Sequence, residues 1–236
     1  MHPFCLVPGE IAGTPGKSRW LRGRSFVTLG GMATEAPIRS RPRSGGAFAP
    51  AGEFWTDDEI MALPDDHGQR YELWNGEIIV MSPAGASHNH VETRLVVALY
   101  QFAETHRLGQ VYSGDTGFRL SPLVCYAPDV AFVTRARLRG LLPNPEKFLQ
   151  GAPDLAVEVL STDDSLRRTQ RKIADYFHHG TVAAWLVLPR RRQVRVYHSA
   201  QDYVTLEGNE ATLTGGTLLP GFEYPLDRLF VDPAFD

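Results

Sequence analysis

Two segments after residue 50 carry apolar side chains at the spacing of an amphipathic helix. In residues 88–106 the apolar positions recur three and four residues apart, and residues 165–178 repeat this pattern. Ser87 is the predicted N-cap of the first helix, because its hydroxyl can accept a hydrogen bond from a free backbone N–H. Gly180 is predicted to end the second helix, since glycine adopts the left-handed backbone at low cost.

A short helix and a hairpin are predicted ahead of these two helices. Thr56 followed three residues later by Glu59 is a capping-box pattern and marks the start of the short helix. In "YELWNGEIIVM", the pair Asn75-Gly76 favours a type I′ turn between two arms rich in β-forming residues. The sequence therefore predicts an N-terminal β-hairpin.

The other apolar runs are short and bounded by turn-forming residues, which is typical of strands. Five strands and a closing β segment are expected, namely residues 111–120, 127–133, 154–160, 183–188, 193–198 and 213–230. Residues 134–152, which are basic and contain proline, are expected to form a loop. Helix 165–178 lies between two apolar strands, as a parallel crossover requires. The predicted class is α/β, with a mixed central β-sheet flanked by helices.

Composition narrows the class of protein. The 236 residues are 43% hydrophobic and 22% charged, which fits a globular domain with a sizeable core. The sequence has no run of about 18 apolar residues, so no membrane span is predicted. Two cysteines, Cys5 and Cys125, are too few for a disulfide framework or a zinc site. They indicate a reducing, cytoplasmic location.

The first fifty residues differ from the rest in composition. They hold eight glycines, six prolines and seven basic residues against two acids, a net charge of +5 in a chain whose total is −3. Residues 1–50 lack helical or strand periodicity and are predicted to be a disordered leader. Residues 51–236 are the predicted folded domain. Two readings of the leader stay open: an extension ahead of a natural start at Met32, and an arginine-rich arm that touches nucleic acid.

Two acids stand inside otherwise apolar strands. Glu158 interrupts "LAVEVL", and Asp129 follows Pro128 at the start of "DVAFV". A glutamate is seldom fully buried unless a cation pairs with it. If the two strands are neighbours, the carboxylates approach each other at one end of the sheet and repel unless a cation lies between them. Carboxylate oxygens suit Mg²⁺, for which Mn²⁺ is a substitute.

A lysine is the third charge that such a site uses. The position on the same strand face as Glu158 and two residues further on is Leu160. The nearest alternative is Lys172 on predicted helix 165–178, whose flexible side chain can reach back across the sheet end. A plainer reading also fits these residues, in which Glu158 and Lys172 form only a structural ion pair.

The motifs "YELWNGEI", "PDVAFV", "LAVEVLS" and "WLV" together resemble the bacterial restriction-endonuclease-like family of the PD-(D/E)XK nuclease superfamily. The resemblance covers about residues 55–230. It implies a restriction-endonuclease-like core and a hydrolase, an endonuclease that uses Mg²⁺ to cleave DNA phosphodiester bonds. In this superfamily an acid after proline and an acid on the next strand bind the metal, and a lysine assists. The residues that the resemblance places in the site are Asp129 and Glu158 as metal ligands, Lys172 as the catalytic lysine, and Glu72 and His88 at two further characteristic positions.

Two positions depart from the family pattern. Leu188 stands where an aspartate is usual, and Arg168 stands where an acid is often found. The alternative reading is therefore a catalytically inactive nucleic-acid-binding or regulatory protein on the same fold. Glu72 also fits a solvated or cross-strand paired acid, and His88 a polar residue near a helix start. DNA is the expected partner, and paired sheet edges would join two copies in a homodimer.

Overall fold

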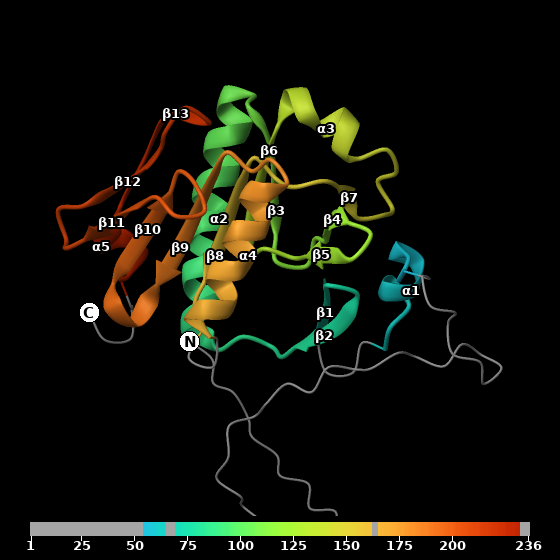
Figure 1. Cartoon of the computed structure of the whole chain (residues 1–236). Coiled ribbons are helices and arrows are strands. Elements are labelled where there is room, and N and C mark those ends of the chain that lie inside the picture. The colour runs from blue at the N-terminus through green and yellow to red at the C-terminus, as the bar shows by residue number, and fades with distance from the viewer. Residues whose placement is uncertain (1–53, 65–68, 162–164, 232–236) are drawn as a thin grey trace, which may run out of the picture. The chain divides into compact units, whose positions relative to one another are not determined.

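The computed structural model describes residues 54–64, 69–161 and 165–231, whose arrangement is shown in Figure 1. The predicted leader, residues 1–50, lies outside the described residues, and its disorder stays a prediction. Among the helices described, none is long and apolar enough to cross a membrane.

The larger sheet holds six strands in the order β11-β10-β9-β8-β6-β3. Its strands are β3 (Gly109–Ser113), β6 (Val130–Thr134), β8 (Leu155–Val159), β9 (Ala183–Leu188), β10 (Gln193–Tyr197) and β11 (Tyr203–Glu207). β8 and β9 run parallel and are joined by helix α4 (Leu166–His178), whereas the other neighbouring strands are antiparallel. The predicted parallel crossover and mixed sheet are confirmed.

A second sheet holds five short strands in the order β2-β1-β5-β4-β7. Its strands are β1 (Arg70–Trp74), β2 (Glu77–Met81), β4 (Phe118–Ser121), β5 (Val124–Tyr126) and β7 (Leu149–Gln150). β1 and β2 form the predicted hairpin, in which Asn75 and Gly76 have φ of 49° and 84°. These positive values are the ones that a type I′ turn requires.

The remaining elements surround the two sheets. They are α1 (Asp57–Met61), α2 (Ala86–His106), α3 (Arg135–Leu141), the 3₁₀ turn η1 (Pro189–Arg191), β12 (Thr212–Gly215), β13 (Leu219–Pro225) and α5 (Leu226–Leu229). Within the described ranges, β12 and β13 pair only with each other. The capping box predicted for α1 is confirmed, because the Thr56 and Glu59 side chains each accept from the other's backbone N–H.

Helices α2 and α4 cover opposite faces of the six-stranded sheet (Figure 1). Leu95 of α2 lies in one apolar cluster with Val157 of β8, and Tyr176 of α4 lies in another with Ala156. Adjacent β8 side chains therefore face different helices, as expected for a strand. Glu158, which follows Val157, lies on the α4 face, and this placement brings an acid under a basic helix.

Two predicted element bounds are wrong. Residues 111–120 are two strands of different sheets, because a turn closed by the Thr116 N–H donating to Ser113 O at 3.1 Å separates β3 from β4. The polar run "SGDTG" is the turn signal between them. Helix α2 begins at Ala86, and its N-cap is the extended residue Gly85 rather than Ser87.

The prediction of a loop over residues 134–152 is also wrong, because α3 and β7 lie there. Leu141 and Leu149 are buried in the cluster that contains Tyr176, and Leu138 packs against it. The arginines of α3 alternate with its few apolar residues, so the sequence shows no clear apolar face of a helix. β7 has two residues, which is too short for an alternating pattern. Strands β5 and β11 had no counterpart among the predicted elements.

Candidate active site

The ammonium of Lys172 lies between two buried carboxylates. Its Nζ donates to Glu158 Oε2 at 2.8 Å and to Glu72 Oε1 at 2.9 Å. The exposed fractions of Lys172, Glu158 and Glu72 are 6%, 7% and 1%. Glu158 comes from β8, Lys172 from α4 and Glu72 from β1, so the contact joins the two sheets through one helix.

Each of these carboxylates has a further donor. The Tyr176 hydroxyl donates to Glu158 Oε1 at 2.8 Å. The Trp74 indole donates to Glu72 Oε2 at 2.9 Å, and the Ala127 N–H donates to Glu72 Oε1 at 3.0 Å. Hydrogen bonds to ionised acceptors are the strong ones, so this network holds both carboxylates in fixed positions.

Asp129 lies beside Glu158 at the end of the six-stranded sheet. β6 and β8 are antiparallel with Val130 opposite Val157, and this register puts Asp129 next to Glu158 across the two strands. The Val159 N–H donates to Asp129 Oδ2 at 2.7 Å. On the other side, His88 Nε2 lies 3.3 Å from Asp129 Oδ2. The neighbouring strands that the sequence hypothesis required are present.

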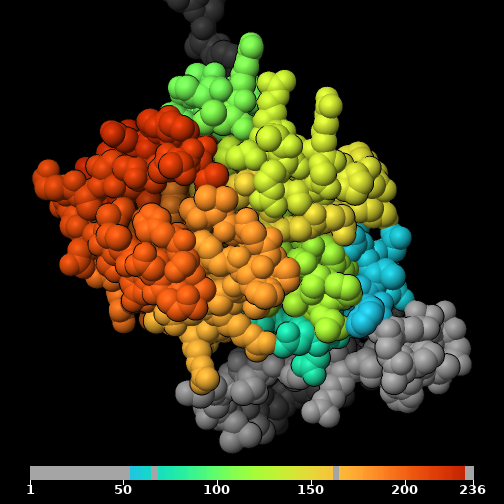
Figure 2. Space-filling view, turned by 45° about the horizontal axis from the view of Figure 1, so that its top comes forward, coloured from blue at the N-terminus to red at the C-terminus, as the bar shows by residue number. Residues whose placement is uncertain are grey.

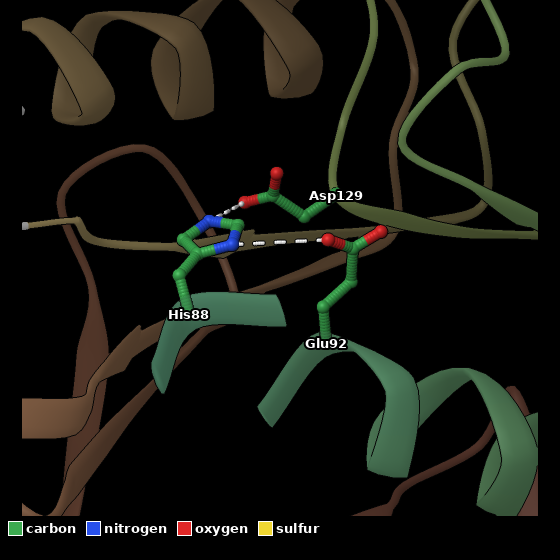
Figure 3. Close-up of side chains that lie close together, drawn as sticks. All are labelled: His88, Glu92 and Asp129. Atoms are coloured by element: carbon green, nitrogen blue, oxygen red, sulfur yellow. Dashed lines mark ion pairs between the residues drawn. The ribbon is translucent and has the colours of Figure 1, made fainter. Parts of the chain in front are cut away.

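His88 and Glu92 project from the first two turns of α2 toward Asp129 (Figure 3). His88 is buried, and its Nδ1 lies 3.7 Å from Glu92 Oε2, beyond hydrogen-bonding distance. Among the residues that the structure describes, this Nδ1 has no hydrogen-bond partner. Ligand atoms of His88, Glu92 and Asp129 lie within 4.8 Å of one another, which makes these residues a candidate group for holding a metal ion. Glu92 was missed from the sequence, although its spacing of four from His88 on a helix was a usable signal.

The protonation of these groups is set by burial and by their neighbours. Burial raises the pKa of Glu158 to about 8, and Lys172 opposes the rise. Burial by itself would lower the pKa of Lys172, but Glu158 and Glu72 raise it. Burial by itself would raise the pKa of Asp129, yet the hydrogen bond and charge of His88 hold it below its ordinary value. Asp129 is therefore the carboxylate that the surroundings keep ionised.

Carboxyl groups outnumber permanent cations in this cluster. The cluster holds four carboxyl groups, those of Glu72, Glu92, Asp129 and Glu158. The permanent cations near them are Lys172 and Arg70, and the Arg70 Nη2 lies 3.8 Å from Asp129 Oδ1. Burial raises the pKa of Glu158 to about 8 and also raises the pKa of Glu92, so two negative charges are left over only when a bound cation keeps all four acids ionised. A divalent cation would balance them.

Comparison with known proteins gives the family. Residues 57–227 match the model of the Uma2 family, described as "Putative restriction endonuclease". The chain belongs to the Uma2 family. A solved structure with a similar fold is that of a putative nuclease belonging to DUF820 from Anabaena variabilis, which is 20% identical with a TM-score of 0.64. The similarity covers 75% of this chain and 97% of that one. No curated protein matches this Uma2 chain.

The Uma2 fold brings the five sequence-predicted residues into one region. Lys172 contacts Glu158 and Glu72, and Asp129 contacts His88 and the backbone of β8. The metal and catalytic roles assigned to them stay predictions. The restriction-endonuclease-like core expected from the sequence is confirmed by the family match and by the similar fold.

The two departures from the family pattern have clear positions in this Uma2 protein. Leu188 is a buried residue of β9 and packs in an apolar cluster with Ile173. The Arg168 guanidinium lies over the Trp74 ring, 4.7 Å from its centroid. Since Trp74 donates to Glu72, Arg168 borders the charged cluster through an aromatic ring instead of supplying an acid.

A hollow of about 300 Å³ opens beside the cluster. Arg70, Gly114 and Ala127 line the side near the site, and Tyr71 and Phe148 add aromatic walls. Figure 2 shows a different face, where the surface around α4 (orange) lies between the C-terminal strands (red) and the segment of α3 and β7 (yellow). Lys172 and Tyr176 lie on the buried side of α4 and are not exposed on that face.

Proposed function

We propose that this Uma2 protein is a metal-dependent endonuclease that hydrolyses phosphodiester bonds of DNA, with Mg²⁺ as the metal and Mn²⁺ as a substitute. The observation that carries the proposal is the convergence of Asp129, Glu158 and Lys172 at the end of β6 and β8 in a member of this family. Two adjacent carboxylates and one ammonium are the charges that metal-assisted phosphodiester cleavage uses.

The residues present fit a divalent cation. Asp129 and Glu158 offer hard carboxylate oxygens of the kind that Mg²⁺ prefers. The cluster also carries two negative charges in excess when its acids are ionised. Asp129 and Glu158 would hold the ion, which when bound supplies Lewis-acid polarisation of the phosphate and lowers the pKa of a water.

The remaining side chains of the cluster position and neutralise charge. Lys172 uses two of its three N–H donors on Glu72 and Glu158, and the third is available for a phosphate oxygen or the attacking water. Glu72 holds the ammonium from the β1 side, and Tyr176 fixes the Glu158 carboxylate. Arg70, at the hollow, would receive the phosphate as it enters. Such fixed donors act where charge develops in the transition state.

A cleavage assay on the full chain tests this function. Plasmid DNA, single-stranded DNA, RNA and a nucleotide phosphate ester would each be incubated with Mg²⁺, with Mn²⁺ or with a chelator. We expect nicking of DNA that the chelator abolishes. Asp129→Asn, Glu158→Gln and Lys172→Met should each lower the rate by about 100-fold or more. Glu104→Gln, an exposed acid of α2, is the matched control. Unchanged cutting by Glu158→Gln rejects this site.

A non-catalytic function is the second candidate, and the satisfied ion pairs favour it. Glu72 and Glu158 already have Lys172 as a partner, so the cluster is also a complete structural network. In that case the protein would bind DNA in a mobility-shift assay without cleaving it under any metal condition.

A cytoplasmic location and a homodimer through sheet edges stay predictions. The edge strand β11 exposes Tyr203 and Val204, and sedimentation of the Val204→Lys variant tests such pairing.

A further inference from the structure

Five exposed arginines lie at the end of the six-stranded sheet where Glu158 lies. β8 and β9 are parallel, with Glu158 opposite Leu186, so both strands finish at this end. β9 leads directly into η1, and α4 begins a few residues after β8. The arginines form what we call the arginine rim, which consists of Arg167 and Arg171 of α4, Arg190 and Arg191 of η1, and Arg192. The carboxyl ends of parallel strands are where open α/β sheets bind their ligands.

One apolar cluster joins the two halves of the arginine rim. Leu166, the first residue of α4, and Leu188, the last residue of β9, both pack in the cluster that contains Ile173. Arg167 follows Leu166 directly, and Arg190 comes just after Leu188. The two halves therefore lie along one edge of the sheet, although they are separate in the sequence.

A hollow of about 550 Å³ opens at the η1 half of the rim. Arg191 and Arg192 line it, and Arg192 Nη1 donates to Phe230 O at 3.1 Å, which leaves its other N–H groups available. Glu207 also lines the hollow and accepts from Gln193 Nε2 at 2.5 Å. Two guanidinium groups on one concave surface suit a phosphate, whose oxygens accept the paired N–H donors of arginine.

The arginine rim contrasts with the charge of the whole domain. Residues 51–236 carry a net charge of −8, since residues 1–50 hold +5 of a total of −3. Both departures from the family pattern fall beside the rim, because Arg168 lies on α4 and Leu188 comes just before η1. Each puts a side chain without negative charge where the pattern has an acid. This end of the chain is therefore more positive than the family pattern implies.

We propose that the arginine rim binds backbone phosphates of DNA on either side of the bond to be cut. The inference rests on the proposed nuclease function for the position of that bond. Contacts to phosphates fix the register of a protein on DNA and carry no sequence information. The rim would therefore supply sequence-independent affinity and align the strand with Asp129 and Glu158.

The competing account is a solvated surface, on which exposed arginines contact only water. Arg135 and Arg139 of α3 fit that account, because they are exposed at the end of the sheet far from Glu158. The rim differs from them in its position beside the candidate active site and in the hollow at η1. The two accounts predict different effects of the same loss of charge at the two ends.

DNA binding by the full chain tests the inference without cleavage. The anisotropy of a labelled DNA duplex would be measured in the presence of a chelator at several salt concentrations. The logarithm of the affinity falls with the logarithm of the salt concentration, by about 0.9 for each phosphate contact. We expect Arg190→Gln with Arg191→Gln, and Arg167→Gln with Arg171→Gln, each to weaken binding by about tenfold or more and to reduce this slope by about 2. Residues 1–50 are kept in every protein, so their basic side chains contribute equally.

Arg135→Gln with Arg139→Gln is the matched control. It removes the same charge from α3, which follows the far end of β6 and lies at the other end of the sheet (Figure 1). We expect its affinity and salt slope to equal those of the parent chain. An equal loss in the control and the rim variants overturns the inference, and so does a parent chain that does not bind DNA or binds an RNA duplex more tightly. Circular dichroism checks folding, and either rim pair carries the test if the other fails to fold.

Cleavage kinetics give a second measurement. Phosphate contacts made equally before and during the reaction affect KM and leave kcat unchanged, so the rim variants should raise KM by about tenfold. Rim-dependent DNA binding in a chain that cuts no substrate supports the rim and rejects the nuclease. DNA cleavage that is lost in Glu158→Gln, together with a salt slope unaffected by both rim pairs, supports the nuclease and rejects the rim.

Discussion

Lys172 and Glu72 are 100 positions apart in the sequence, and their charged atoms lie 2.9 Å apart in the folded chain. The lysine is on a helix that covers the six-stranded sheet, and the glutamate is on a hairpin of the other sheet. Glu158, only 14 positions before Lys172, takes the other side of the ammonium. The charge balance of the candidate active site thus depends on one local contact and one very distant contact.

Lys172→Met should destabilise the fold as well as remove cleavage. It leaves Glu158 and Glu72 buried without their cation, and breaking a buried ion pair costs about 3–5 kcal/mol of unfolding free energy. Adding Glu158→Gln to Lys172→Met removes one of the orphaned charges and should restore part of that loss. Urea unfolding of the two proteins measures the difference. Equal stability of the single and double variants contradicts the buried pairing.

Tyr176→Phe should remove one hydrogen bond that holds the Glu158 carboxylate in place, without changing the charge of the cluster. A hydrogen bond to a charged acceptor contributes about 1.5–3 kcal/mol, and this loss should appear in thermal or urea unfolding. Tyr126→Phe is the matched control, because it keeps the ring that borders Lys172 and loses only a hydroxyl that donates to Asp175 at 2.7 Å rather than to Glu158. Both variants should lose similar stability, and only Tyr176→Phe should lower the rate of DNA cleavage. A parallel fall in both rates would point to general destabilisation.

Cys125 should make the fold less stable in alkali. Burial raises the pKa of its thiol to about 12, whereas an unfolded cysteine titrates near about 8.5. Above that lower value the unfolded chain loses a proton that the folded chain keeps, so unfolding becomes easier as pH rises. The contribution is about 1.4 kcal/mol per pH unit between roughly pH 9 and 11. In a Cys5→Ser background, Cys125→Ala should show a shallower fall of unfolding free energy with pH, and parallel slopes contradict the assignment.

Gly109 and Gly140 should respond oppositely to alanine. A Cβ on Gly109 would lie 2.0 Å from the backbone oxygen of Val133 on the paired strand, so Gly109→Ala must displace β3 or β6. A Cβ on Gly140 would meet nothing within 4 Å, and in helix α3 alanine is favoured over glycine by about 0.5–1 kcal/mol. Unfolding midpoints should fall markedly for Gly109→Ala and rise slightly for Gly140→Ala. Similar midpoints for both would contradict the close strand approach.

The elements that the sequence predicted well are those whose signals are local. The Asn75-Gly76 turn, the capping box at Thr56 and the apolar spacing of α2 and α4 each need only neighbouring residues, and all are present. The acid in "LAVEVL" was also informative, because burial of Glu158 demanded a cation and Lys172 supplies it.

What could not be predicted depends on distant contacts. Leu141 of helix α3 packs against a core that includes Tyr176. The sequence around residue 141 does not indicate that contact, because Tyr176 is distant in the chain. Glu92 resembles an ordinary surface acid of an amphipathic helix until Asp129, 37 positions later in the printed sequence, folds back against the same turn. Two partners of Glu72, Ala127 and Lys172, likewise lie on other segments, so its pairing with a buried cation has no local signal.

The hairpin of β1 and β2 supplies one of the two carboxylates that contact Lys172. Glu72 contacts Lys172 from that hairpin, and Glu158 contacts it from the six-stranded sheet. The number of carboxylates around the ammonium therefore depends on how the two sheets are positioned relative to each other. A small shift of the hairpin would leave Lys172 with one counter-charge instead of two. Substitutions under the hairpin should therefore change the electrostatics of the candidate active site.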